Sequence, residues 1–381
     1  MLSIFLRPES VLIEELVKDV LKRLNDIFPS DCKERLVGVE SSIRVIESLL
    51  STGSKEVYSL GIWGIGGIGK TTIASAIFSK ISTDFDGSYF IQNVREESEK
   101  SGGLAHLRQT LLSAILEDGN VSIVCRNIGL NFRSKRLSRK KVLIVFDDVS
   151  TSEQMEFLIG DKGWLMPGSR LVITARDKQV LRNCGVDTIY EVKELFDDDA
   201  LMLFSRYAFG KNHPNADYME LSNKIIKYAK GVPLAIKVLG RFLCGRRIQD
   251  WESAMNKMKR IPHVDIQRVL KVSYDGLDDE EQNIFLDIAC FFKGEDKDCV
   301  IRFLDGCGFS AEIGISVLVD KCLMIISNNT IMMHDLLQEM GREIVRQESI
   351  KDPGKRSRLW HHEDIYNVLT KNMVSTEVTT T

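Results

Sequence analysis

The sequence contains no long apolar run. Within its 381 residues, no uninterrupted hydrophobic segment reaches the roughly 18 residues that a membrane-spanning helix needs. The opening letters MLSIFL end at Arg7-Pro8-Glu9 and are too few for the apolar core of a signal peptide. We therefore expect no membrane span, and we expect a cytoplasmic or nucleocytoplasmic protein.

Patterned cysteines and an excess of charge are also missing. The eight cysteines are scattered, with no C-x-x-C pair and no histidine at the spacing of a zinc site. This usage predicts neither a disulfide framework nor a bound zinc ion, and it is typical of a reducing compartment. The formal net charge of −3 gives no overall attraction to nucleic acid or to an anionic membrane. We therefore expect no direct nucleic-acid binding.

The chain does contain a glycine-rich loop, GIGGIGKTT at residues 64–72, in an otherwise ordinary globular composition of 44% hydrophobic and 28% charged residues. The loop fits the phosphate-binding pattern G-x-x-x-x-G-K-[ST], in which glycines let backbone N–H groups surround phosphate oxygens. Residues 57–63 predict a buried strand before it, and residues 73–78 predict a helix after it. Lys70 would reach the β- and γ-phosphates, and the Thr71 hydroxyl would help to hold Mg²⁺.

A second segment, VLIVFDD at residues 142–148, supplies carboxylates for such a site. Its continuous apolar run predicts a strand covered on both faces, ending beside the phosphate loop. We assign Asp147 to Mg²⁺, through a water molecule, and Asp148 to polarising an attacking water. An acidic N-cap pair for the next helix is a compatible alternative, because Ser150 and Glu153 have the spacing of a capping box.

Further strands are predicted at residues 88–94, 169–176 and 188–192, separated by helical segments. Five strands alternating with helices predict the parallel α/β sheet of a P-loop NTPase. Thr174 and Arg176 fall at the end of their strand, where the arginine could sense a γ-phosphate.

The second half of the chain predicts two further units. Residues 196–245 have a helical pattern, broken by Gly-Val-Pro at residues 231–233, which favours a small helical domain. Asp278 and Glu281 have capping-box spacing, and CLMIISNNTIMMH at residues 322–334 predicts two short strands around an Asn-Asn turn. Helices followed by such a hairpin suit a winged helix. Without a basic patch, we interpret it as an intramolecular clamp rather than a DNA-binding element.

In kind and order, these motifs resemble the NB-ARC nucleotide-binding module of plant TIR-type NLR disease-resistance proteins. The segments that carry the resemblance are LVGVESSIRVIESLL, GIGGIGKTT, FDGSYFIQNVREES, LIVFDDVS, GSRLVITARD, KGVPLAIKVLG, FLDIACFF and MMHDLLQEMGREIV. They extend over nearly the whole chain, and Ser150 together with FLDIACFF favours the TIR-type branch. The resemblance implies an α/β P-loop NTPase sheet followed by a small helical domain and a winged-helix domain.

The resemblance also implies a switch, with ADP bound in a closed resting state and ATP with Mg²⁺ in an open state that oligomerises with other NLR chains. The contacts that it implies are Val37 and Gly38 at the adenine, Pro233 on the base, and Gly64, Gly66, Gly67, Ile68, Gly69, Lys70, Thr71 and Thr72 at the phosphates. Arg176 would sense the γ-phosphate. His334, steadied by Asp335, would reach the β-phosphate of ADP.

Three features also have simpler explanations. A histidine between a strand and a helix start, such as His334, is more often a helix cap or a partly buried core residue than a ligand contact. The basic run RSKRLSRKK at residues 133–141 could be a nucleic-acid or nuclear-localisation patch, but we favour a solvated helix end. His361 and His362 lack partners at metal-ligand spacing, and we assign them no role.

We divide the chain into residues 1–34, a linker helix following a missing TIR domain; 35–193, the P-loop domain; 194–262, the helical domain; 263–350, the winged helix; and 351–381, a linker toward missing leucine-rich repeats. Because the family's NAD-cleaving activity belongs to the TIR domain, we do not expect it here.

The sequence thus predicts a nucleotide-operated switch of plant innate immune signalling, reset by slow ATP hydrolysis. One alternative is a P-loop ATPase or kinase whose turnover is its function, although the sequence contains no recognisable site for an acceptor. The other is a truncated interaction module that pairs with full-length receptors and needs no hydrolysis. Loss of Lys70 would leave partner binding intact only in the interaction module.

Overall fold

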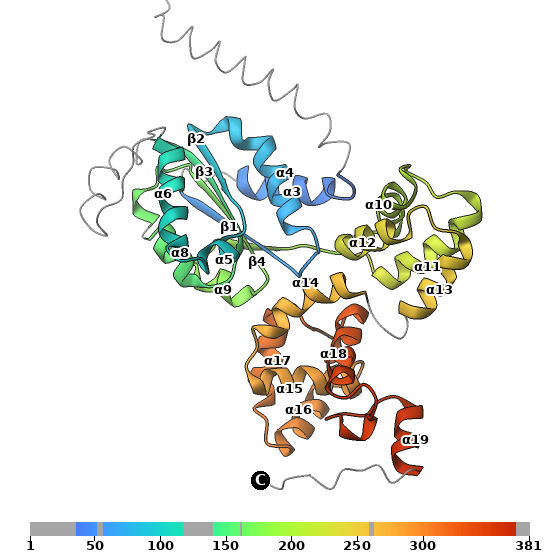
Figure 1. Cartoon of the computed structure of the whole chain (residues 1–381). Helices are drawn as coiled ribbons and strands as arrows, with labels where there is room; N and C mark the ends of the chain where they lie inside the picture. The colour runs from blue at the N-terminus through green and yellow to red at the C-terminus, as the bar shows by residue number, and fades with distance from the viewer. Residues whose placement is uncertain (1–35, 52–55, 117–139, 161, 259–262, 371–381) are drawn as a thin grey trace, which may run out of the picture.

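The computed structural model describes residues 36–51, 56–116, 140–160, 162–258 and 263–370. These residues form an α/β region, a group of helices beside it, and a third, mainly helical region below both (Figure 1). The predicted linker helix in residues 1–34 and most of the basic run lie outside the described residues.

The α/β region is built on a five-stranded sheet with the order β2-β3-β4-β1-β5. The strands are β1 (Tyr58–Trp63), β2 (Gly87–Ile91), β3 (Val142–Val149), β4 (Arg170–Ala175) and β5 (Thr188–Glu191). Every neighbouring pair is parallel. The predicted parallel sheet is therefore confirmed, and its long apolar runs follow from burial of both faces.

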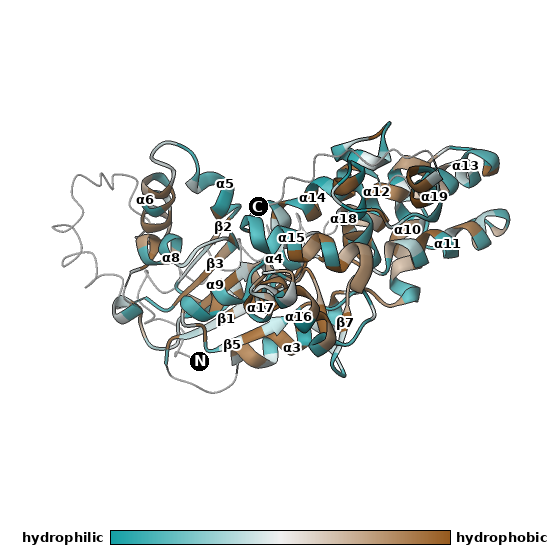
Figure 2. Cartoon of the chain, turned by 90° about the horizontal axis from the view of Figure 1, so that it is seen from below, coloured by the Kyte–Doolittle hydropathy of each residue, from teal (hydrophilic) through white to brown (hydrophobic). Residues whose placement is uncertain are grey.

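Helices cover both faces of this sheet. They are α3 (Glu40–Ser51), α4 (Lys70–Ile81), α5 (Val94–Ser98), α6 (Gly103–Leu116), α8 (Ser152–Leu158) and α9 (Lys178–Asn183). Alternate residues of β3 face opposite sides, because side chains alternate along a strand. Leu143 and Val145 join a core with α3 and α4, whereas Ile144 and Phe146 join one with α6, α8 and α9. The strand β3 and the helix α6 carry many hydrophobic residues (Figure 2).

The start of α8 differs from the sequence prediction by one residue. Its capping box is formed by Thr151 and Gln154, and the Gln154 side chain accepts the backbone N–H of Thr151 at 3.2 Å. The predicted capping box of Ser150 and Glu153 is therefore wrong. Gln154 can take the place of a glutamate in such a box, because its side-chain oxygen accepts the same backbone N–H.

The helical region consists of α10 (Asp197–Phe209), α11 (Met219–Ala229), α12 (Pro233–Leu243) and α13 (Ile248–Met258). The predicted break is confirmed: Lys230 and Gly231 adopt φ of 49° and 70°, and Pro233 is the first residue of α12. Proline suits this position because its missing N–H would have no partner within the helix. Helices α10 and α12 pack closely at Gly240, where an added Cβ would lie 2.7 Å from Cβ of Tyr207.

The third region contains α14 (Val264–Asp275), α15 (Asp279–Asp287), a π-helical turn (Ile288–Phe292), α16 (Lys297–Gly306), α17 (Ala311–Asp320), β6 (Ile325–Ser327), β7 (Thr330–Met332), α18 (Asp335–Glu348) and α19 (His362–Thr370). The predicted hairpin is confirmed, with Asn328 and Asn329 at φ of 49° and 60°. The capping box at α15 is also confirmed: Asp278 N–H donates to Glu281 at 3.0 Å, and Glu281 N–H donates to Asp278 at 2.8 Å.

The winged-helix region contacts the edge of the α/β region through the end of α17. The Trp63 indole N–H donates to the Asp320 carbonyl at 2.9 Å, and Arg182 pairs with the Asp320 carboxylate at 2.9 Å. The next residue, Lys321, pairs with Asp177 at 3.0 Å. This group of residues, the α17 contact, joins two regions that are far apart in sequence.

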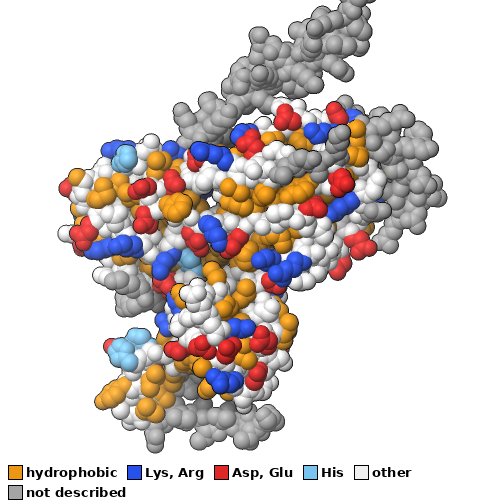
Figure 3. Space-filling view, turned by 180° about the vertical axis from the view of Figure 1, so that it is seen from behind, with side chains coloured by type: hydrophobic (Ala, Val, Ile, Leu, Met, Phe, Trp, Pro, Cys, Tyr) orange, Lys and Arg blue, Asp and Glu red, His pale blue; other side chains and the backbone are white. Residues whose placement is uncertain are grey.

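The sequence predicted no membrane span, no disulfide framework and no basic patch, and the described residues can be compared with each of these predictions. None of their helices has the length and apolar character to cross a membrane. Six cysteines lie within the described ranges, and all are free thiols. On the face in Figure 3, positive and negative side chains are interspersed over the described surface.

Candidate functional site

The candidate site is built on the loop between β1 and α4. Gly67 and Gly69 adopt φ of 82° and 104°, left-handed conformations that residues with a Cβ rarely enter. Helix α4 begins directly after Gly69, at Lys70, so the unpaired N–H groups of its first turn adjoin the loop. The predicted order of strand, glycine loop and helix is therefore confirmed, and it forms a cradle suited to an anion.

Lys70 is buried and its ammonium group faces the loop. Nζ donates to the carbonyl oxygens of Gly64 at 2.6 Å and Ile65 at 3.0 Å. Burial, assisted by repulsion from Arg176, lowers the pKa of Lys70 to about 8. The two carbonyl groups are neutral, so they do not balance the charge of the Lys70 ammonium. A phosphate bound in the loop would supply that negative charge.

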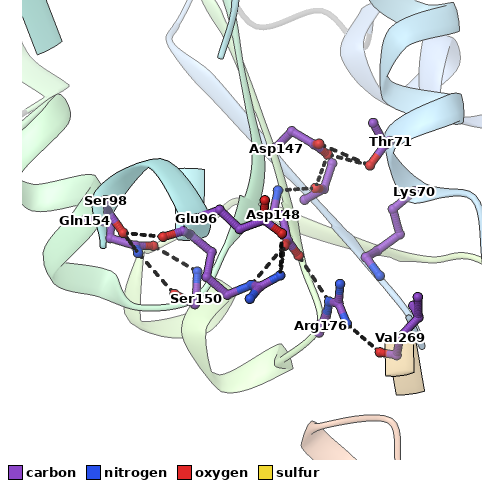
Figure 4. Close-up of polar contacts among 12 residues, drawn as sticks. Lys70, Thr71, Glu96, Ser98, Asp147, Asp148, Ser150, Gln154, Arg176 and Val269 are labelled. Carbon is purple, nitrogen blue, oxygen red and sulfur yellow. Dashed lines mark hydrogen bonds and ion pairs between the residues drawn. The ribbon is translucent and has the colours of Figure 1, made fainter. Parts of the chain in front are cut away.

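Asp147 and Thr71 face each other across the mouth of the loop (Figure 4). The Thr71 hydroxyl donates to the Asp147 carboxylate at 2.9 Å, and Thr174 donates to the same carboxylate at 2.8 Å. Burial raises the pKa of Asp147, although both hydroxyls oppose that shift. A carboxylate beside a hydroxyl fits Mg²⁺, which commonly takes few protein ligands and completes its shell with water and phosphate oxygens.

Asp148 lies in an unusual position at the end of β3. The strand continues through both aspartates to Val149, its register shifts between Phe146 and Val149, and Asp148 adopts φ of 57°. This twist turns the Asp148 side chain toward Arg95 and Arg176 rather than toward Thr71.

The two arginines hold the Asp148 carboxylate between them. Arg95 binds it at 2.9 Å and Arg176 at 3.1 Å. Burial would raise the pKa of Asp148, but the two guanidinium groups outweigh burial and lower it. Arg176 also donates to the Val269 carbonyl of α14 at 2.9 Å, so the proposed γ-phosphate sensor contacts the winged-helix region (Figure 4).

Two adjoining cavities lie over this loop. The first, of about 60 Å³, is lined mainly by residues with apolar side chains and includes the predicted residues Val37, Gly38, Ile68, Gly69, Thr72 and Pro233. The second, of about 280 Å³, is lined mainly by residues with polar or charged side chains and includes Gly67, Gly69, Lys70, Thr71, Thr72, Asp147, Asp148, Arg176 and Pro233. We call them the apolar lobe and the polar lobe. This pairing suits a base at one end and phosphates at the other.

The loop itself touches the other two regions. The Leu234 N–H of α12 donates to the Gly67 carbonyl at 3.1 Å. A Cβ built on Gly66 would lie 3.0 Å from Arg176 Nη1 and 3.1 Å from the Val269 carbonyl oxygen. A ligand in the loop is therefore positioned to affect how all three regions pack.

His334 is placed outside the linings of both lobes. Its Nδ1 accepts the Leu336 N–H at 3.1 Å and caps α18, and its Nε2 lies 3.5 Å from the Lys230 carbonyl. Asp335 is bound to Lys230 at 3.1 Å and to Lys293. The structure thus gives His334 the helix-cap role that was its simpler explanation and links it to the segment just before Pro233.

Sequence reasoning missed three cations that line the site. Arg95 lines the polar lobe, Lys193 lines the apolar lobe, and Lys237 lines both lobes. Lys237 follows Pro233 by one helical turn, so the two share a face of α12. That spacing was available in the sequence, but the position of α12 against the loop was not.

Comparison with known proteins places these features in context. The family described as NB-ARC domain matches residues 39–214, and the winged-helix domain of the Roq1-like disease resistance protein matches residues 278–349. "Disease resistance protein RPV1" of Vitis rotundifolia is 45% identical over 96% of this chain and 26% of its own length. "TMV resistance protein N" of Nicotiana glutinosa is 41% identical over 94% of this chain and 31% of its own length.

The chain therefore spans between about a quarter and a third of the length of these curated relatives. Among solved structures, a Walker-type ATPase of Pyrococcus abyssi aligns with a TM-score of 0.58 over 81% of this chain and 97% of its own, at 14% identity. That likeness shows a shared fold alone.

Proposed function

The chain belongs to the NB-ARC family as it occurs in plant TIR-type NLR disease-resistance proteins, and on that premise we propose that it is an ADP/ATP switch of immune signalling. In the resting state it binds ADP and stays closed. ATP with Mg²⁺ replaces ADP in the active state, which opens and oligomerises with other NLR chains. Slow hydrolysis returns it to rest.

One observation carries this proposal: the phosphate loop of the α/β region contacts both of the other regions. Leu234 of the helical region donates to Gly67, and Val269 of the winged-helix region lies against Gly66 and Arg176. A nucleotide in the two lobes would thus lie where these regions meet. A ligand shifts an equilibrium between states only by its difference in affinity for them, and a site shared by several regions provides that difference.

The residues at the loop have distinct roles in this proposal. Lys70 binds the terminal phosphates, and Thr71 and Asp147 hold Mg²⁺, which supplies a positive charge to the phosphate oxygens. Asp148 polarises the attacking water, and Arg176 senses the γ-phosphate. Since Arg176 also binds the Val269 carbonyl, a γ-phosphate that attracts this arginine would weaken its hold on α14.

His334 has a further role in the proposal. Its ring lies 3.5 Å from the Lys230 carbonyl, three residues before Pro233, and burial lowers its pKa. A neutral ring caps α18 through Nδ1 and could turn Nε2–H toward the β-phosphate of ADP. The same histidine would then connect the diphosphate to the winged helix in the closed state only.

The test is to purify the chain under native conditions, denature it and identify the released nucleotide by chromatography. The proposal expects near-stoichiometric ADP. Lys70→Arg is the matched variant: it should release almost none, because a planar fork cannot replace a compact ammonium bonded to Gly64 and Ile65 in a buried site.

The two results together decide the assignment. Native affinity for ADP in Lys70→Arg would contradict the role of Lys70. An empty site in the unaltered chain, with partner binding retained, would favour the interaction module. Turnover of about 1–100 per second would favour a metabolic ATPase or kinase instead.

A further inference from the structure

Lys237 projects from α12 to the junction of the two lobes. It lines both of them, together with Gly69, Thr72 and Pro233. Its side chain is half-buried, and it belongs to the helical region rather than to the phosphate loop. A long cationic side chain is therefore directed into the site from the region that covers it.

The other cations in the polar lobe have defined partners. Arg95 and Arg176 share the carboxylate of Asp148, and Lys70 donates to loop carbonyls. Among the described residues, Lys237 has no carboxylate within ion-pair distance, and its ammonium lies 5.9 Å from the ring centroid of Tyr207. A half-buried ammonium at the edge of an anion-binding cavity, with no carboxylate beside it, is available to form a charge-assisted hydrogen bond with an anion that enters the cavity.

We propose that Lys237 binds the nucleotide at the junction of the lobes, through the phosphate nearest the ribose. This inference rests on the proposed function and adds to it a contact from the helical region. Gly69 and Thr72, at the start of α4, line both lobes together with Lys237. The ligand class is a nucleoside 5′-phosphate, and an uncharged nucleoside would not engage the lysine. The contact would make the position of α12 depend on the phosphate charge.

The experiment measures the affinity and release rate of fluorescent ADP at low and high salt for four proteins: the unaltered chain, Lys237→Met, Lys237→Arg and Arg241→Met. Lys237→Met keeps the apolar stem and removes the charge, and Lys237→Arg keeps the charge. Arg241 is the matched control because it lies one turn further along α12, 5.0 Å from the same Tyr207 ring, and lines neither lobe.

We expect Lys237→Met to bind ADP about 10-fold more weakly, the usual loss for one charge-assisted hydrogen bond, and with a smaller dependence on salt. Lys237→Arg should recover most of the affinity, and Arg241→Met should bind as the unaltered chain does. Native affinity in Lys237→Met would overturn the inference while leaving the proposed function intact. Equal losses of ADP affinity in Lys237→Met and Arg241→Met would overturn the inference, because they would show that both side chains act by packing on α12 rather than by binding phosphate. Failure of the unaltered chain to bind ADP would refute the proposed function and the inference together.

Discussion

The α17 contact provides a direct test of whether docking of the winged helix retains the nucleotide. Lys321 and Asp177 form an ion pair of 3.0 Å, and each side chain is only 21% exposed. The perturbation is a charge swap: Lys321→Asp and Asp177→Lys singly, and then both together. Each single change places two like charges at the interface, and the double change restores an opposite pair.

The burial of this pair sets the expected size of the effect. Exposed ion pairs contribute about 0.2–1 kcal/mol, and breaking a fully buried pair costs about 3–5 kcal/mol. A pair that is mostly buried should lie between them, at about 1–2 kcal/mol of coupling. If ADP leaves only after the contact opens, each single variant should release it roughly 5- to 30-fold faster, since about 1.4 kcal/mol corresponds to tenfold.

The assay is the release rate of fluorescent ADP after mixing with excess unlabelled ADP. Asp177 also caps α9 by accepting the Gln179 N–H at 2.8 Å, so Asp177→Lys also removes the stability that this cap provides. A double-mutant cycle cancels the effect of the lost cap, because it leaves only the interaction energy between positions 177 and 321. The reasoning is refuted if the two changes are additive, so that the swapped protein releases ADP as fast as the single variants combined predict.

Three further predictions concern the histidine cap, its neighbour and the loop. His334→Asn keeps an N-cap but cannot titrate. Because burial lowers the pKa of His334 below 6.5, the stability of the unaltered chain should fall as the pH drops below about 6.5. The melting temperature of the Asn variant should therefore fall less between about pH 7.5 and 5.5 than that of the unaltered chain. Equal pH slopes would contradict this. Asp335→Val leaves Lys230 without its carboxylate at 3.1 Å and should speed ADP release several-fold; an unchanged rate would argue against the latch. Gly67→Ala places a Cβ 2.7 Å from Leu234 Cβ at positive φ, and a loss of about 1–3 kcal/mol should appear in denaturant unfolding. Native stability would mean that the loop shifts freely.

Local patterns in the sequence predicted the framework well. The strand before the loop, the helix after it and the Asn-Asn hairpin each depend on a few adjacent residues, and the structure confirms them. The capping box at α8 was misplaced because Ser150 and Thr151 are both good caps. The Gln154 side chain accepts both backbone N–H groups, at 2.9 and 3.2 Å, and the start of α8 at Ser152 makes Thr151 the N-cap. Neighbouring residues do not contain that information.

The site was predicted less completely, for a physical reason. Asp147 and Thr71 meet because both lie at the same edge of one sheet, which the order of motifs already implied. Lys237 and the Arg176 contact with Val269 depend on how separate regions pack, and a single sequence carries no local signal for that. The cap made by His334 was similarly one of two open interpretations until its neighbours were placed.

The crowding around Gly66 has a consequence for genetics. A side chain at this position would press on Arg176 and on the Val269 carbonyl, from which even a single Cβ would be separated by only 3.0 and 3.1 Å. A larger residue would therefore disturb the phosphate cradle and push the winged helix away at the same time. A substitution of Lys70 would then cause loss of nucleotide binding alone, whereas a substitution of Gly66 would cause both loss of nucleotide binding and opening of the chain. A dominance test on a Gly66 allele would therefore measure these two effects together, and a test on a Lys70 allele would measure only the first.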